Sequence, residues 1–313
     1  MKPEILQIEP LMPEIQLRLE ASYASHKLFE IRDQDALIKQ VASNVRGIVT
    51  GGSSGASEAI VSALPNLEII AINGVGTDKV DLEYARDRGI RVTNTPEVLT
   101  EDVADLAMAL ALAVLRQICV ADRFVRDGRW VRNEDLPLAR KASHKRLGVV
   151  GMGRIGRAIA RRAAGFDMAI AYTDLRAFDD LPYRYISALT ELARESDILV
   201  VAASGGSGSR GIINATVLNA LGRKGVLVNV ARGPIVDEPA LVAALTGGGI
   251  AGAGLDVFAD EPNVPAALLK MENVVLQPHR ASATVETRLA MGELVLENLV
   301  AHFGGKALLT AVV

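Results

Sequence analysis

Three polar residues that can carry out acid–base chemistry follow apolar runs typical of buried strands. Arg232 follows the run 226–231, Glu261 follows the run 253–258, and His279 follows the run 273–278. Ligands of open α/β sheets bind outside the carboxyl ends of the strands, so we expect these three side chains to converge on one cleft. A guanidinium can hold the carboxylate of a 2-oxo acid and polarise its ketone. An imidazole can protonate the ketone oxygen as hydride reaches the carbon, and a carboxylate bonded to the ring favours the imidazolium.

Each of these residues also has an ordinary structural interpretation. Arg232 could pair with Asp237 on the surface, Glu261 could be a solvated turn acid, and His279 could be a buried ring with its hydrogen bonds satisfied. Their joint appearance after consecutive strands, downstream of a glycine-rich turn, favours catalysis. The other histidines lack such placement and are predicted to be surface or packing residues: His26, His144 and His302.

The glycine-rich turn lies between a predicted strand and a predicted helix. The strand 147–150 leads into Gly151-Met-Gly153-Arg154-Ile155-Gly156 and then into an Ala- and Arg-rich segment. In this pattern the first glycine permits the tight turn, the second lets the backbone approach a pyrophosphate, and the third allows close helix–strand packing. The helix N-terminus then faces an anion. The turn therefore predicts dinucleotide binding, with Arg154 and Ile155 part of the site.

An acidic residue follows the next strand at the distance expected for ribose binding. Asp174 comes 18 residues after Gly156, directly after the run 168–173. Its carboxylate would accept hydrogen bonds from the adenosine 2′-hydroxyl and repel a 2′-phosphate, which favours NAD over NADP. Arg176 could instead pair with that phosphate, and Asp174 could be an exposed turn residue. Further cofactor contacts are predicted at Ala231 and Asp256. Asp256 lies inside a predicted strand, where an acidic residue is unfavourable, so a contact with the cofactor would explain its presence there.

The elements that must position these residues are alternating strands and helices. Continuous apolar runs, rather than alternating ones, predict parallel strands covered on both faces, and nine strands suggest two sheets. An Ala- and Leu-rich helix that Thr100 and Asp102 can cap is predicted over 100–119, followed by a surface connection over 126–146. The nine predicted strands are 45–50, 67–72, 90–93, 146–150, 168–173, 197–203, 225–230, 252–258 and 273–276.

Composition excludes several classes of protein. The 313 residues predict about two domains. Half of them are hydrophobic and 23% charged, a globular balance, and the net charge of −3 argues against nucleic-acid binding. The single Cys119 and the scattered histidines favour a reducing compartment and no metal site. The N-terminus does not match a signal peptide, and no run is long enough to span a membrane, so we expect a soluble, cytoplasmic protein.

Taken together, six motifs resemble the D-isomer-specific 2-hydroxyacid dehydrogenases over nearly the whole chain. They are Asn-Gly-Val-Gly (73–76), Thr-Glu-Asp-Val-Ala-Asp (100–105), Gly-Met-Gly-Arg-Ile-Gly (151–156), Val-Asn-Val-Ala-Arg-Gly (228–233), Gly-Leu-Asp-Val-Phe-Ala-Asp-Glu-Pro (254–262) and Gln-Pro-His-Arg-Ala-Ser-Ala-Thr (277–284).

The resemblance implies an α/β fold in which a Rossmann-type NAD(P)-binding domain, 100–284, is inserted into a smaller flavodoxin-like substrate domain, 1–99 plus 285–313. The C-terminal helix, about 285–303, would return to the first domain. Arg232, Glu261 and His279 would be the catalytic set. The backbone amides of Val75 and Gly76 would bind the substrate carboxylate together with Arg232, and hinge closure would exclude water from the hydride step.

Within the family, the segments 182–185 and 259–265 look most like the glyoxylate and hydroxypyruvate reductase branch. The chain departs from that branch at Asp174-Leu175, where an Arg favouring NADPH is usual, and at the Ser- and Gly-rich segment 204–209. The resemblance also implies a homodimer, in which a residue such as Trp130 approaches the partner's active site. Two alternatives stay open: a non-enzymatic dinucleotide-sensing interaction protein of the same fold, and a phosphite- or formate-type dehydrogenase, for which the family pairs the His with Gln rather than Glu in formate oxidation.

Overall fold

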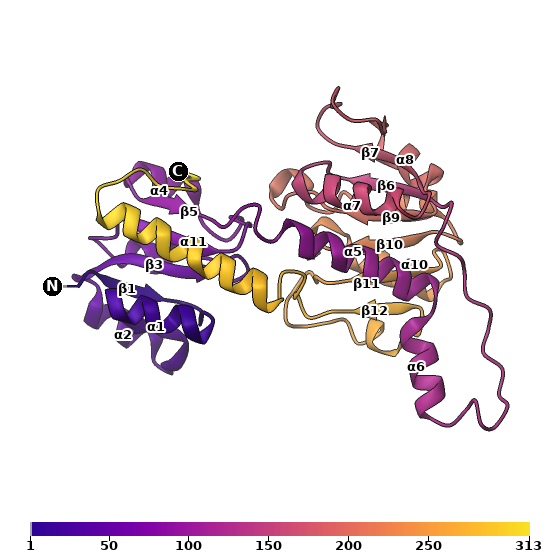
Figure 1. Cartoon of the computed structure of the whole chain (residues 1–313), viewed down its shortest axis with the longest axis horizontal. Helices are drawn as coiled ribbons and strands as arrows, with labels where there is room; N and C mark the ends of the chain where they lie inside the picture. Colours follow the sequence, from indigo (N-terminus) through magenta and orange to yellow (C-terminus); the bar gives the residue numbers. More distant parts are fainter. Residues whose placement is uncertain (1) are drawn as a thin grey trace. The chain divides into compact units, whose positions relative to one another are not determined.

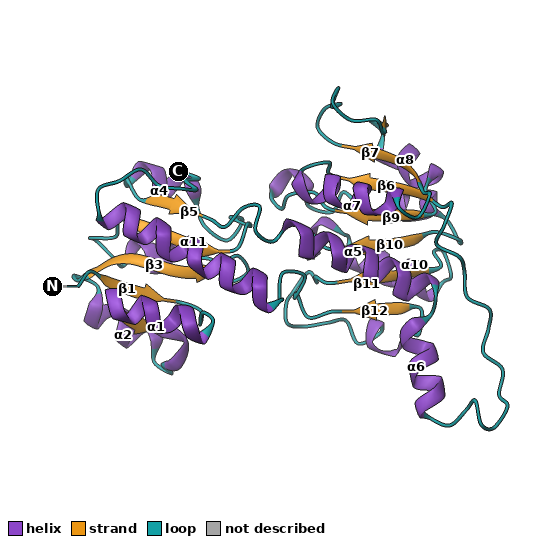
Figure 2. Cartoon of the chain, viewed as in Figure 1, coloured by secondary structure: helices purple, strands orange, loops and turns teal. Residues whose placement is uncertain are grey.

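The computed structural model describes residues 2–313 and divides the chain into two compact units, each with its own parallel sheet (Figures 1 and 2). Of the described residues, unit 1 comprises 2–99 and 282–313, and unit 2 comprises 100–281. The sequence places the second boundary at 284/285, three residues later than this division. Unit 2 is an insertion into unit 1.

Unit 1 has a five-stranded sheet in the order β2-β1-β3-β4-β5, all parallel. This is the flavodoxin-like order, as the resemblance implies. The strands are β1 Glu4–Gln7, β2 Ala24–Lys27, β3 Val45–Gly51, β4 Ile69–Asn73 and β5 Arg91–Thr93. The helices are α1 Pro13–Ser22, α2 Gln34–Val41, α3 Glu58–Ser62, α4 Leu82–Asp87 and α11 Val285–Phe303, with a short 3₁₀ turn at Leu28–Glu30.

Helices cover both faces of the unit 1 sheet, which explains its continuous apolar strands. On one face, Ile15 and Leu19 of α1 and Leu299 of α11 pack on strand residues such as Val49. Figure 1 shows α1 and α11 side by side over this face. On the other face, residues of α2, α3 and α4 form a second core with Ile48 and Ile70. The C-terminal helix has the predicted bounds, and the side chain of Thr284 caps it by accepting from the amide of Thr287.

Unit 2 has a seven-stranded parallel sheet in the order β12-β11-β10-β9-β6-β7-β8. Counted from β6, this order is 7-6-5-4-1-2-3, so it contains the 3-2-1-4-5-6 order of a Rossmann fold. The strands are β6 Arg146–Val150, β7 Ala169–Thr173, β8 Arg184–Tyr185, β9 Ile198–Val201, β10 Val226–Asn229, β11 Gly252–Leu255 and β12 Val274–Leu276. The helices are α5 Thr100–Leu115, α6 Ile118–Arg126, α7 Arg154–Ala164, α8 Leu189–Glu195, α9 Ala215–Leu221 and α10 Glu238–Thr246. Short 3₁₀ turns occupy Ser207–Ser209, Gly233–Ile235 and Leu268–Lys270.

Helices also cover both faces of the unit 2 sheet. Leu192, Leu218 and Leu241, from α8, α9 and α10, join the core under one face. On the other face α5 lies so close to β11 that a Cβ at Gly254 would be 2.8 Å from Leu110 Cβ. All seven strands run in the same direction, so their carboxyl ends form one edge of the sheet.

Two expectations about this unit were wrong in detail. The helix predicted over 100–119 ends at Leu115, because Gln117 adopts a left-handed conformation with φ 55° and α6 begins after it. Thr100 is the first residue of α5 rather than a residue before it. The segment 127–145 contains neither helix nor strand, in agreement with a surface connection.

Among residues 2–313, none of the single helices is long and apolar enough to cross a membrane. Only α5 and α6 together have that length and composition, and they are bent by 60° relative to each other. No group of three or more His, Cys, Asp or Glu side chains among these residues is arranged to hold a metal ion.

Candidate active site

The glycine turn joins β6 to α7 at the carboxyl edge of the unit 2 sheet. Gly151 has φ 91°, and a Cβ there would lie 2.6 Å from Ala203 Cα. A Cβ at Gly156 would lie 2.1 Å from the Gly151 carbonyl oxygen. At Gly153, by contrast, a Cβ would meet no heavy atom within 4 Å, so the backbone faces open space. A tight turn with an open backbone at the N-terminus of an 11-residue helix fits a dinucleotide pyrophosphate. Arg154 and Ile155 are the first two residues of that helix.

Asp174 lies directly after β7 and its carboxylate contacts the glycine turn. One carboxylate oxygen accepts from the Met152 amide at 2.7 Å and the other from the Leu175 amide at 2.6 Å. Arg176 and Arg157 stack on the Phe178 ring, with their guanidinium carbons 5.6 and 4.8 Å from its centroid. The acid predicted to bind ribose and the arginine that could instead bind a phosphate therefore both lie on the short segment after β7.

Arg232 begins a tight turn after β10 that the buried Asn229 holds. The Asn229 side chain accepts from the Ala231 amide at 3.1 Å and donates to the Arg232 carbonyl at 3.0 Å. The Arg232 guanidinium donates to the Ala231 carbonyl at 2.8 Å. Asp237, the surface partner considered for Arg232, caps α10 by accepting from the Ala240 amide. Sequence reasoning missed Asn229 as a residue that shapes this turn, although a buried Asn at the end of an apolar strand is itself a signal.

The turn that carries Arg232 touches the segment that carries Glu261. A Cβ at Gly233 would lie 1.9 Å from the Phe258 carbonyl carbon, so the two backbones are in direct contact. The Phe258 amide in turn donates to Glu261 Oε1 at 3.0 Å. Glu238, on α10, accepts from the neighbouring Ala259 amide at 3.0 Å.

Glu261 and His279 form a hydrogen-bonded pair. His279 Nδ1 lies 2.7 Å from Glu261 Oε2, and the two side chains are 27% and 28% exposed. Burial of the carboxyl opposes its ionisation, but the hydrogen bonds from His279 and the Phe258 amide, with the positive charge of Arg232, hold the pKa of Glu261 below its ordinary value. The structure thus brings together the three residues predicted to be catalytic, at the carboxyl edge of one sheet.

Asp256 holds the segment that carries His279. The sequence prediction placed it inside a strand, which was wrong: β11 ends at Leu255 and Asp256 follows it. Its carboxylate accepts from the amides of Arg280 and Ala281 at 2.8 and 3.0 Å, and its carbonyl accepts from the His279 amide at 2.8 Å. Burial raises the pKa of Asp256. These bonds fix His279 at φ 48°, a left-handed backbone conformation. Asp256 and Ala231, predicted as cofactor contacts, lie at the same edge as the glycine turn.

In unit 1, Val75 and Gly76 follow β4. Asn94 donates to the Val75 carbonyl at 2.9 Å, and the Thr95 amide donates to the Gly74 carbonyl at 2.9 Å. Two buried side-chain oxygens next to this segment, Asn73 Oδ1 and Thr95 Oγ1, have no hydrogen-bond partner in the described part of the chain. The loop predicted to bind a substrate carboxylate is therefore fixed through its carbonyl groups by Asn94 and Thr95, and polar side-chain atoms lie next to it.

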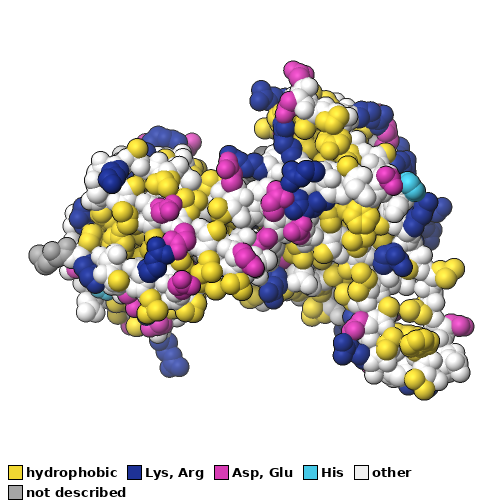
Figure 3. Space-filling view, in the orientation of Figure 1, with side chains coloured by type: hydrophobic (Ala, Val, Ile, Leu, Met, Phe, Trp, Pro, Cys, Tyr) yellow, Lys and Arg dark blue, Asp and Glu magenta, His cyan; other side chains and the backbone are white. Residues whose placement is uncertain are grey.

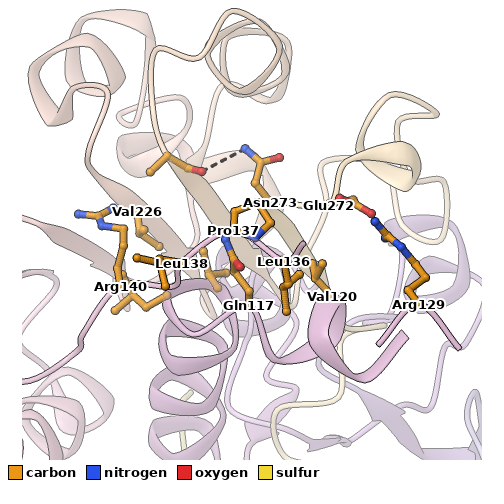
Figure 4. A pocket seen from close by; sticks show the side chains of 13 residues that line it. Gln117, Val120, Arg129, Leu136, Pro137, Leu138, Arg140, Val226, Glu272 and Asn273 are labelled. Carbon is orange, nitrogen blue, oxygen red and sulfur yellow. Dashed lines mark hydrogen bonds between the residues drawn. The ribbon is translucent and has the colours of Figure 1, made fainter. Parts of the chain in front are cut away.

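A cavity lies away from these residues, at the opposite edge of the unit 2 sheet (Figure 4). It has a volume of about 330 Å³ and lies against the amino ends of β10, β11 and β12, where Asn273 donates to the Ala251 carbonyl. Leu136, Pro137 and Leu138 of the surface connection line it. The predicted catalytic residues follow the carboxyl ends of the same strands, so this cavity does not contain them.

The remaining histidines lie elsewhere. His26 pairs with Glu4 at 2.7 Å and His302 with Glu68 at 3.1 Å, both in unit 1. His144 lies on the exposed connection that precedes β6. None of the three is part of the arrangement around Glu261.

The sequence and the fold are similar to those of known enzymes. Residues 108–281 match the family model described as the NAD-binding domain of D-isomer-specific 2-hydroxyacid dehydrogenases. The chain is 48% identical to a 2-ketogluconate reductase of Gluconobacter oxydans, over 100% of this chain and 99% of the relative. It is 47% identical to a glyoxylate/hydroxypyruvate reductase of Arabidopsis thaliana, over 99% and 98%.

Among solved structures, an NADPH-dependent glyoxylate/hydroxypyruvate reductase of Sinorhizobium meliloti, in complex with NADP and malonate, superposes with a TM-score of 0.91. It is 43% identical, and the match covers 100% of this chain and 97% of that one. The family match spans more than half of the chain, and the relatives align over nearly its whole length. The chain is therefore a member of the D-isomer-specific 2-hydroxyacid dehydrogenase family, and its unit 2 is the NAD(P)-binding domain.

Proposed function

We propose that this protein reduces small 2-oxo acids to D-2-hydroxy acids with a reduced nicotinamide dinucleotide, glyoxylate and hydroxypyruvate being the first candidates. The observation that carries the proposal is the 2.7 Å hydrogen bond between His279 and Glu261 beside the Arg232 turn, on a sheet whose glycine turn fits a dinucleotide. The names of the relatives support the same reaction class.

The residues of unit 2 have complementary roles in this reaction. Glu261 engages Nδ1 of His279, so the proton delivered to the ketone oxygen is the one on Nε2. Arg232 polarises the ketone and orients the substrate carboxylate through its planar fork. The bound dinucleotide supplies the hydride. In the reverse direction, neutral His279 accepts the proton of the alcohol.

In unit 1, the backbone amides of Val75 and Gly76 bind the substrate carboxylate. Asn94 and Thr95 hold carbonyl groups of this segment by hydrogen bonds. The loop is therefore ordered before an anion binds, so binding does not carry the entropy cost of ordering it.

For the cofactor, we infer a preference for NADH over NADPH. The carboxylate of Asp174 lies against the glycine turn, where it would accept from a ribose hydroxyl and repel a 2′-phosphate. Arg176, which is two residues after Asp174 and stacks on Phe178, is the residue through which NADPH would still be accepted.

The proposal is tested by following the absorbance of NADH with glyoxylate, hydroxypyruvate and pyruvate. Turnover with at least one of them is expected. Tight binding of NADH without turnover of any 2-oxo acid would instead support a dinucleotide-sensing protein, and oxidation of phosphite or formate in its place would support the other alternative.

We also propose that the protein is a homodimer, assembled through α6 and the connection that follows it. Large apolar side chains of this stretch are exposed, among them Trp130 at 69% and Leu138 at 95%. Figure 3 shows hydrophobic side chains at the surface of this part of unit 2. Apolar surface of this kind on a folded chain supports a partner, and a second copy is the partner that the family resemblance implies. Sedimentation of the wild type and of a Val131→Glu, Leu138→Glu variant tests it: the wild type should sediment as a dimer and the variant as a monomer.

A further inference from the structure

The carboxyl edge of the unit 1 sheet carries an acidic side chain to which the reaction assigns no role. Glu9 follows β1, which pairs with β3, and β3 pairs with β4. Glu9 therefore lies at the same edge as the segment Gly74–Gly76 that follows β4. It is partly buried.

The carboxylate of Glu9 is held in place by its neighbours. Glu9 Oε1 accepts a hydrogen bond from the Ser54 hydroxyl, on the loop after β3. The Glu9 carbonyl accepts from the buried Gln7 side chain at 2.9 Å. A Cβ at Gly51 would lie 2.0 Å from Glu9 Oε2, so only a glycine leaves the carboxylate room in this position.

The next glycine connects this carboxylate to the loop that binds the substrate carboxylate. A Cβ at Gly52 would lie 3.6 Å from the Gly76 nitrogen and 3.5 Å from the Gly76 oxygen. Gly51 and Gly52 thus form a strip without side chains, with Glu9 against Gly51 and Gly76 against Gly52. Neither glycine places a side chain between the Glu9 carboxylate and the loop proposed to anchor the substrate.

We propose that Glu9 and Ser54 select the far end of the substrate, an inference that rests on the proposed function and names its substrate class. A carboxylate is a strong acceptor for hydroxyl groups, so the pair favours 2-oxo acids with a hydroxyl on the carbon next to the ketone, such as hydroxypyruvate and 2-oxo sugar acids. The negative charge of Glu9 disfavours a second carboxylate at this place, as in oxaloacetate. Glyoxylate has no carbon beyond its carbonyl group, so its reduction should not depend on Glu9 or Ser54.

The test compares kcat and KM for glyoxylate, hydroxypyruvate and oxaloacetate in the wild type, Glu9→Gln and Ser54→Ala, with Glu83→Gln as a control on an exposed glutamate of α4. For Glu9→Gln we expect the hydroxypyruvate-to-glyoxylate ratio of kcat/KM to fall about tenfold, and the oxaloacetate-to-glyoxylate ratio to rise about tenfold. Ser54→Ala should lower the first ratio by a smaller factor. Glyoxylate itself should change by less than about threefold in every variant, which shows that each one folds.

Three results would overturn the inference. Ratios that stay at the wild-type values in both variants of the pair remove its role in selection while the proposed function stands. Equal losses for all three substrates make Glu9 a structural residue only. A wild-type protein that turns over none of the substrates overturns the proposed function and this inference with it.

Discussion

The carbonyl oxygen of Asp256 accepts a hydrogen bond from the amide of His279 at 2.8 Å. The same aspartate binds the next two amides with its carboxylate, so a single residue after β11 holds three consecutive amides, those of residues 279–281, on the segment after β12. The position of the proposed acid–base group is therefore set by the neighbouring strand rather than by its own.

Replacement of His279 should remove most of the activity and leave the fold intact. We expect His279→Asn to lower kcat with glyoxylate by about 10²- to 10⁴-fold, the usual contribution of a general acid. Asn is chosen because His279 has a positive φ, which Asn tolerates. His144→Asn is the matched control, since His144 also has a positive φ and lies away from Glu261. Equal activity of the two variants would contradict the role of His279.

Asp256→Asn should impair the reaction through the position of His279. An amide side chain has one acceptor oxygen where the carboxylate has two, so one of the amides of Arg280 and Ala281 loses its bond. We expect kcat to fall about 10- to 100-fold, because small displacements of a catalytic group are costly. Burial raises the pKa of Asp256, so the folded protein disfavours the charge that Asn removes. The melting temperature of the variant should therefore fall little, even though its kcat falls. A variant with wild-type kcat would show that these two bonds are dispensable.

Glu261 should make stability depend on pH in the acid range. The folded protein holds the pKa of Glu261 below its ordinary value of 4.5, so the ionised group stabilises the fold above that value. This stabilisation is lost as the pH falls through the lowered pKa. Melting curves from pH 7 to pH 3 should therefore show the wild type losing stability relative to Glu261→Gln below about pH 5. A difference that grows in favour of the wild type at low pH would have the wrong sign.

Cofactor preference should depend on two residues of the segment after β7, Asp174 and Arg176. The wild type is expected to bind NADH more tightly than NADPH, and Asp174→Ser should remove most of that difference by taking away the charge that repels a 2′-phosphate. Arg176→Gln should weaken NADPH further and leave NADH unchanged. Dissociation constants from fluorescence titration measure both effects, and equal affinities in the wild type would remove the role given to Asp174.

Two glycines of the turn should respond differently to the same added methyl group. Gly156→Ala places a Cβ 2.1 Å from the Gly151 carbonyl and should cost about 1–3 kcal/mol of stability. Gly153 has φ −73° and open space, so Gly153→Ala should melt like the wild type. It should nevertheless bind NADH at least about tenfold more weakly, because the methyl group obstructs the approach of the pyrophosphate. Unchanged NADH affinity in Gly153→Ala would argue against the turn as the phosphate site.

The sequence predicted the elements whose burial leaves a pattern and missed those without one. All nine predicted strands are present within a few residues, because both faces of each are covered and their apolar runs are continuous. The missed strands are polar or very short: β1 begins with Glu4, β2 reads Ala-Ser-His-Lys, and β8 has two residues. The break before α6 was missed because glutamine is not one of the residue types that often adopt the left-handed conformation, as Gln117 does here.

For the site, residue types at strand ends were enough to predict that Arg232, Glu261 and His279 lie at one edge of the sheet. The residues that support them could not be identified in the same way. Asp256 holds amides of the segment after β12, and such a pairing depends on sheet order, which an apolar run does not encode. Asn229 bonds only to the turn that directly follows it, so its role needed the geometry of that turn. Glu9 lies more than 40 positions from Ser54, so only the folded sheet brings the two together.

The contact between Gly233 and Phe258 leaves the two chain segments that carry Arg232 and Glu261 no side chain between them at this point, so no side-chain change there can bring them closer together. The spacing of the reacting groups is thus a property of the main chain and is the same whatever acid is reduced. Diversification toward new substrates would then proceed through the loops of unit 1, where the side chains of Glu9 and Ser54 lie.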